Sequence, residues 1–189
     1  GGRRDDPPGD GRCDRAHCSL REAITAVNAG TTAGIIRLPG VPASGPAAGA
    51  MNTTLTLASP LPAITQSVEI RGPGAELFAI DANASAGQDR RVLEFRGQLT
   101  ATLSGVRVTG GRAPAGGGVL VAENATVTLR NVAVTGNAAD GSGGGILVLS
   151  DGNLTLEDSR LAQNRVLAAA AGGGGISVGA ARATLRNTR

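Results

Sequence analysis

The sequence has almost no large aromatic side chains. Its 189 residues include two Phe and no Trp or Tyr, although 41% of them are hydrophobic. The core must therefore be built from Val, Ile, Leu and Ala, and 30 Gly residues allow tight turns of the backbone. This composition favours a thin, repetitive architecture.

Lysine is also absent. All 18 basic residues are Arg, and they are scattered along a chain that has 15 acidic residues. Nucleic-acid binding usually needs a basic cluster with stacking aromatic side chains, so we expect no nucleic-acid partner. No run of 18 apolar residues occurs, so we expect no membrane span in this chain.

A repeat fills the second half of the chain. The stretch "TLSGVRVTGG" recurs as "TLRNVAVTGN", "TLEDSRLAQN" and "TLRNTR", and the four copies begin at Thr102, Thr128, Thr155 and Thr184. A second unit, three glycines followed by an apolar residue, begins at Gly116, Gly143 and Gly173. Repeats of this length indicate a solenoid in which each period is one coil.

The aligned repeats predict which residues stack. The inward columns are predicted to contain Leu103, Leu129, Leu156 and Leu185, and then Val106, Val132 and Ser159. Two further columns are predicted to be corners with left-handed backbone, at Gly105, Asn131, Asp158 and Asn187 and at Gly111, Asn137 and Asn164. Apolar runs this short, broken by Gly or Asn, exclude a helical solenoid. The fold class is therefore all-β, a parallel β-helix.

Two parts of the chain are predicted. Residues 1–33 contain an acidic loop, a cysteine pair and a capping helix, and residues 34–189 form the β-helix. Residues 41–50, 81–89 and 167–175 are expected to be loops that leave the coils. The last repeat stops early, so we expect the β-helix to be incomplete at its C-terminal end and to continue in a longer polypeptide.

The helix is predicted from its capping pattern. Ser19 and Glu22 form a capping box, and Leu20, Ile24 and Val27 lie on one apolar helix face. Because a solenoid needs a terminal element to cover its apolar end, this short helix is predicted to be the N-terminal cap.

Cys13 and Cys18 precede the helix, and three interpretations are open. They form a disulfide, they are half of a metal site, or they are a redox pair. A zinc site has only His17 as a further soft ligand, and the spacing differs from that of thiol oxidoreductases. A local disulfide is favoured, and it implies an oxidising compartment.

Acidic residues crowd the N-terminus. Asp5, Asp6, Asp10 and Asp14 lie close together among glycines, and their oxygen atoms suit Ca²⁺. The stretch departs from an EF-hand loop because Pro8 replaces a ligand and no Glu closes the loop. The alternative interpretation is a frayed acidic terminus. No other cofactor is expected.

The stretch "CDRAHCSLREAITAVNAG" resembles the N-terminal CSLREA motif of bacterial surface and secreted proteins. "LASPLPAITQSVEIRGPGA" and the "GGGI" and "TGN" units resemble the right-handed parallel β-helix repeats that follow this motif, within the pectate lyase-like superfamily. The glycine units are also similar to those of polymorphic outer membrane proteins. The resemblance implies a right-handed β-helix and a secreted or cell-surface location. It supplies no catalytic residue.

Two classes of function remain. The first is a non-catalytic exported module with a structural or adhesive role, whose ligand is a carbohydrate or a host surface. The second is a fragment of a polysaccharide lyase or glycoside hydrolase with its catalytic coils beyond residue 189. Glycosidases use two facing carboxylates, whereas Asp140, Asp151, Glu157 and Asp158 suit turns and solvated positions. The non-catalytic class is therefore favoured.

Overall fold

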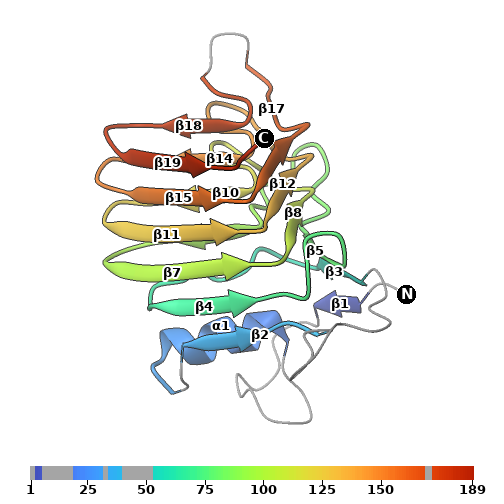
Figure 1. The fold of residues 1–189 in the computed structure, drawn as a ribbon. Coiled ribbons are helices and arrows are strands. Elements are labelled where there is room, and N and C mark those ends of the chain that lie inside the picture. The colour runs from blue at the N-terminus through green and yellow to red at the C-terminus, as the bar shows by residue number, and fades with distance from the viewer. Residues whose placement is uncertain (1–2, 6–18, 32–33, 40–52, 169–171) are drawn as a thin grey trace.

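The chain folds into a parallel β-solenoid of about five turns with one short helix near its N-terminus (Figure 1). This computed structural model describes residues 3–5, 19–31, 34–39, 53–168 and 172–189. Every pairing between its named strands is parallel. The all-β parallel β-helix that the repeat predicts is confirmed.

Four sheets extend along the stack of coils. Sheet 1 contains β2 (Ile35–Arg37), β4 (Val68–Arg71), β7 (Leu99–Ser104), β11 (Ala125–Arg130), β15 (Asn153–Glu157) and β19 (Arg182–Arg186). Sheet 2 contains β1 (Arg3–Asp5), β3 (Thr53–Leu57), β5 (Phe78–Asp81), β8 (Arg107–Thr109), β12 (Ala133–Thr135) and β16 (Arg160–Ala162). Sheet 3 contains β6 (Leu93–Phe95), β10 (Val119–Val121), β14 (Ile146–Val148) and β18 (Ile176–Val178). Sheet 4 contains β9 (Arg112–Ala113), β13 (Ala138–Ala139) and β17 (Arg165–Val166).

The predicted leucine column is confirmed and forms the core behind sheet 1. In register it runs through Ile36, Ile70, Leu103, Leu129, Leu156 and Leu185. Leu129 is completely buried, whereas Leu185 in the last strand is 49% exposed. Each fully buried Leu contributes about 1.5–3 kcal/mol of transfer free energy, so stacking like residues supplies the core that aromatic side chains do not.

The first predicted corner column is also confirmed. Its four residues have positive φ angles of 63°, 49°, 49° and 48°, at Gly105, Asn131, Asp158 and Asn187. At Gly105 a Cβ atom would lie 2.5 Å from the carbonyl oxygen of Gly72. Glycine is therefore required at this coil by both its backbone angle and its close contact.

The prediction for the second corner column was wrong by one position. The residues with positive φ are Gly110, Gly136 and Gln163, each one residue before the predicted ones. Asn137 instead turns its amide into the stack, where it is completely buried and accepts a hydrogen bond from Gly111 N at 2.9 Å. The recurring Asn is explained by its amide and not by its backbone conformation.

These inward amides connect successive coils. Asn137 N donates to Asn164 Oδ1 at 3.1 Å, and Asn137 Nδ2 donates to the carbonyl of Val108 at 3.1 Å. Asn164 Nδ2 donates in turn to the carbonyl of Val134 at 2.8 Å. The ladder satisfies backbone groups at a bend where the sheets cannot pair them.

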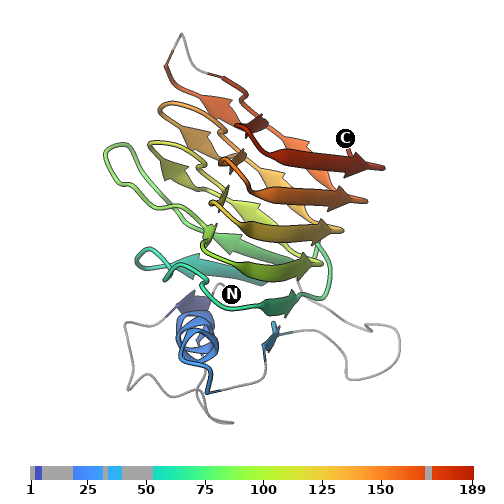
Figure 2. The same ribbon diagram turned by 90° about the vertical axis from the view of Figure 1, so that its left-hand side faces the viewer.

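Helix α1 (Leu20–Asn28) covers the N-terminal end of the stack, as Figure 2 shows. The predicted capping box is present, because Glu22 N donates to Ser19 Oγ at 3.2 Å and Ser19 N donates to Glu22 Oε2 at 2.8 Å. Leu20, Ile24 and Val27 are buried in the same core cluster as the ladder residues. The helix is the predicted cap.

Two polar side chains fix the helix on the first coil. Arg21 donates to the carbonyls of residues 59–60 at 2.9 and 2.6 Å. Asn28 donates to the carbonyl of Ala63 at 2.7 Å and accepts from Thr65 N at 2.9 Å. The segment between β3 and β4 therefore holds the cap as well as continuing the coil.

The N-terminal residues contribute a strand that the sequence did not predict. β1 pairs in parallel with β3, so Asp5 lies opposite Leu57 in sheet 2. Two predicted loops lie wholly or partly outside the described residues, at 41–50 and 167–175. The loop predicted at 81–89 begins one residue too early, because Asp81 is the last residue of β5, and the segment after it leads to β6.

Candidate functional site

Five of the six residues predicted to form the metal site and the disulfide lie outside the described residues. This is the case for Cys13, Cys18, Asp6, Asp10 and Asp14. The disulfide and the calcium site therefore stay predictions. The remaining candidate calcium ligand, Asp5, is the last residue of β1. Among the described ranges, no group of three or more His, Cys, Asp or Glu side chains is placed to hold a metal ion.

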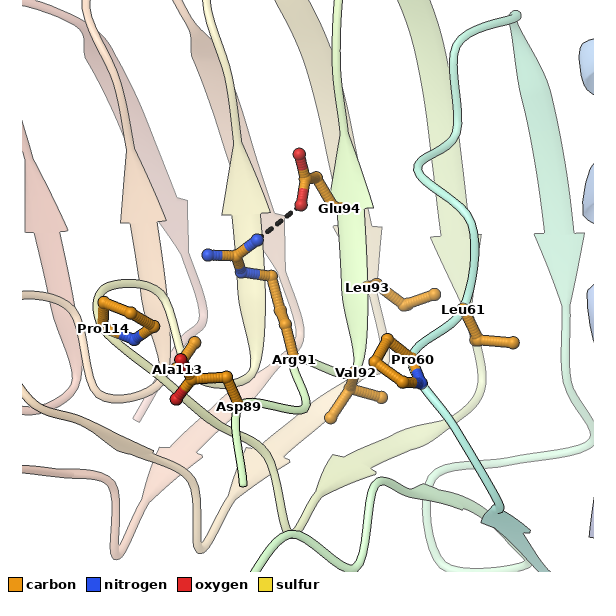
Figure 3. Close-up of a pocket in the computed structure, with 9 residues that line it drawn as sticks. All are labelled: Pro60, Leu61, Asp89, Arg91, Val92, Leu93, Glu94, Ala113 and Pro114. Carbon is orange, nitrogen blue, oxygen red and sulfur yellow. Dashed lines mark hydrogen bonds and ion pairs between the residues drawn. The ribbon is translucent and has the colours of Figure 1, made fainter. Parts of the chain in front are cut away.

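A shallow depression lies beside sheet 3, where the loop after β9 approaches β6 (Figure 3). Its lining residues are Pro60, Leu61, Asp89, Arg91, Val92, Leu93, Glu94, Ala113 and Pro114. Arg91 crosses it and donates to the carbonyls of Ala115 and Gly116 at 2.7 and 2.8 Å. The guanidinium group of Arg91 therefore crosses the depression and joins the loop after β9 to the coil that contains β6.

Glu94 is the best-placed carboxylate in this depression. Its Oε2 accepts from Arg91 Nη1 at 2.5 Å, and its Oε1 accepts from Arg96 Nε at 2.9 Å. The hydrogen bond to this carboxylate raises the pKa of Arg96 above its usual value. Because both oxygens of Glu94 bind guanidinium groups of the same coil, the arrangement suits a local structural ion pair and not a pair of free catalytic acids.

A second hollow follows the corner between sheets 1 and 2. Its floor includes the left-handed residues Asn131, Asp158 and Asn187, and Asn187 Nδ2 donates to Asp158 Oδ1 at 3.1 Å. Arg107 and Glu76 form an ion pair of 2.7 Å, and Glu76 belongs to its wall. This groove offers amide and carboxylate groups for hydrogen bonds, but its acids are already paired.

The outer face of sheet 1 has a regular polar pattern. In one column Thr102, Thr128, Thr155 and Thr184 lie opposite one another in consecutive strands. Two residues earlier along the strands, Thr100 lies opposite Thr126. This row-and-column arrangement follows from the repeat phase, because side chains two residues apart share one face of a strand.

Ion pairs edge the same face. Arg71 donates to both carboxylate oxygens of Glu69 at 2.6 Å. This hydrogen bond lowers the pKa of Glu69 below its usual value, with a smaller contribution from the charge of Arg71. Glu157 joins two coils, since it lies 2.7 Å from Arg130 and 3.6 Å from Arg186. Sequence reasoning placed Glu157 outward but missed these partners, which only the register identifies.

Comparison with family models, curated proteins and solved structures finds no match to this chain. The resemblance to CSLREA proteins therefore stays an expectation from the sequence. Within the part of the chain that the structure describes, no helix is long and apolar enough to cross a bilayer.

Proposed function

We propose that this chain is a non-catalytic, exported β-helix module of a bacterial surface or secreted protein, with a structural or adhesive role. The observation that carries the proposal is the use of polar side chains to join coils. Glu76, Glu157 and Asn137 each bind a group of another coil through their side chains, and both glutamates are paired with arginines. A module built in this way suits a rigid stalk or binding surface.

Export is supported by the sequence alone. The favoured disulfide between Cys13 and Cys18 requires an oxidising compartment, and the CSLREA-like stretch resembles that of exported proteins. The test is alkylation without reductant, followed by mass measurement, on protein produced in a bacterial periplasm. We expect no labelled cysteine. Two labelled thiols would contradict the disulfide and remove this support for export.

The non-catalytic role is tested on a panel of plant, bacterial and animal polysaccharides. The purified chain is incubated with each polymer, and both bound protein and newly released sugar ends are measured. We expect binding to one or more polymers without release of sugar ends or unsaturated products.

Release of products by the wild-type chain would favour the alternative, a polysaccharide lyase or glycoside hydrolase. The Glu94→Gln and Asp89→Asn variants then locate the activity, because both residues line the depression in Figure 3. Product release that either substitution abolishes would overturn the proposal.

A further inference from the structure

Six threonines form a two-column array on the outer face of sheet 1, here called the threonine face. Its members are Thr100, Thr102, Thr126, Thr128, Thr155 and Thr184. The four strands that carry them lie one above another with little change of direction (Figure 1). The face is therefore a nearly flat, ordered surface and not a cleft.

The spacing of the array is set by the backbone. Neighbouring strands of a sheet are about 4.8 Å apart, and residues two positions apart along a parallel strand are about 6.6 Å apart. Thr126 and Thr128 in β11 lie opposite Thr100 and Thr102 in β7, which gives a complete block of four. Because Thr is β-branched, few side-chain rotamers are open to it, and the hydroxyl groups keep this lattice.

The hydroxyl groups are available to a ligand. None of the six makes a side-chain hydrogen bond to another residue in the described ranges, whereas Ser104 in β7 donates to the carbonyl of Ile70. Thr100 and Thr126 are exposed, and the other four are half-buried. Each therefore presents one methyl group and one unpaired hydroxyl to water.

A flat partner with a matching two-dimensional repeat fits this face best. Small ligands and soluble sugar chains usually bind in concave sites, and the face has neither concavity nor an aromatic ring for stacking. The two spacings are close to the repeats between oxygen atoms on a prism face of ice. Methyl groups that confine water and hydroxyls that bind it would hold a first water layer in that order.

We propose that the threonine face binds ice. Polar and charged residues limit its size. Asn153 and Arg182 follow Thr126 in its column, and Glu69 lies opposite Thr102 in β4. Arg130 and Glu157 continue two of the strands. A face of this size adsorbs to growing crystals and inhibits their recrystallisation, and it lowers the freezing point little.

The test measures uptake of the purified 189-residue chain into slowly growing ice, together with the growth of ice grains in a frozen film. Thr128→Lys places a long charged side chain at the centre of the array. Thr135→Lys is the matched control, because Thr135 is a half-buried residue of sheet 2 that faces outward. It lies opposite Thr109 in β8 and Ala162 in β16, so it belongs to no two-column array of threonines. Circular dichroism melting shows that both variants fold.

We expect the wild type and Thr135→Lys to enter the ice and to keep ice grains small. We expect Thr128→Lys to fall to the level of an inert protein in both measurements. Exclusion of the wild type from ice overturns the proposal, as does an equal loss in both variants. Wild type that is excluded from ice but binds a solid polysaccharide through Thr128 would assign the face to a glycan instead.

Discussion

At the residue scale, the completely buried side-chain amide of Asn137 is hydrogen-bonded to both neighbouring coils. Its Oδ1 accepts from Gly111 N, and its Nδ2 donates to Asn164 Oδ1. Replacing Asn137 with Ala would leave Gly111 N and the carbonyl of Val108 without their partner. We expect a loss of about 1–3 kcal/mol in the free energy of unfolding, measured with urea. Asn153→Ala is the control, since Asn153 is exposed in β15. Equal stability of the two variants would contradict the role of the buried amide.

A second residue-scale prediction concerns pH. The hydrogen bond from Arg71 lowers the pKa of Glu69, so the pair stabilises the fold above the ordinary pKa of glutamate, and this contribution is lost as the pH falls through the lowered pKa. The side chains are 36% and 39% exposed, so the contribution is small. We expect the difference in urea midpoint between wild type and Arg71→Gln to shrink below about pH 4.

The control for this titration is Arg182→Gln. Arg182 is exposed in β19 and forms no ion pair with a residue in the described ranges. The difference in urea midpoint between Arg182→Gln and the wild type should not shrink over the same pH range. If the difference in urea midpoint between wild type and Arg71→Gln stayed constant with pH, the ion pair between Arg71 and Glu69 would not contribute to stability as expected.

At the element scale, sheet 1 is held by its inward ladder. Leu129→Asp would place an unpaired charge between Leu103 and Leu156, and we expect a loss of about 3–5 kcal/mol in the free energy of unfolding. Thr126→Asp, in the same strand but on the outer face, should change stability by less than about 1 kcal/mol. Thermal unfolding measures both. Similar melting temperatures would reject the inward placement of Leu129.

The cap helix gives a second prediction at this scale. Ser19→Ala removes the hydroxyl that accepts from Glu22 N, and we expect a loss of about 1 kcal/mol. Thr25→Ala, at an exposed position of α1, is the control and should cost less. A larger effect at Thr25 than at Ser19 in urea unfolding would show that the capping box is not what fixes the start of the helix.

The elements also show how far the sequence predicts the structure. The repeat phase identified the leucine ladder and the corner at Asn131, because like residues at one phase must share one place in each coil. It misplaced the second corner because Gln163, which has a φ of 56°, is not a residue type that signals left-handed backbone. β1 was missed because its three residues, Arg3–Asp5, have no apolar alternation.

The surfaces were harder to predict than the core. The partners of Glu157 and the lattice of the threonine face depend on the register between strands, and a single sequence gives the register only where repeats align. The depression beside Arg91 depends on the path of Pro114 and Ala115 after β9, and these two residues precede the glycine unit that repeats.

At the scale of the whole molecule, one core cluster extends from the cap helix to Leu156, and ion pairs such as those of Glu157 with Arg130 and of Glu76 with Arg107 join neighbouring coils outside it. The aliphatic core and the polar contacts between coils together explain how a chain with two Phe forms an ordered solenoid. It also leaves one face of sheet 1 flat and regular, which is the feature that the ice-binding proposal uses.

The central claim is that consecutive coils stack in parallel and in register. It is tested most directly by methyl-methyl nuclear Overhauser effects in protein labelled at Leu and Val methyl groups. Leu129 lies directly between Leu103 and Leu156, and adjacent strands are about 4.8 Å apart, so its methyl groups should show strong effects to both leucines. Effects from Leu129 to neither leucine would contradict the stacked β-helix.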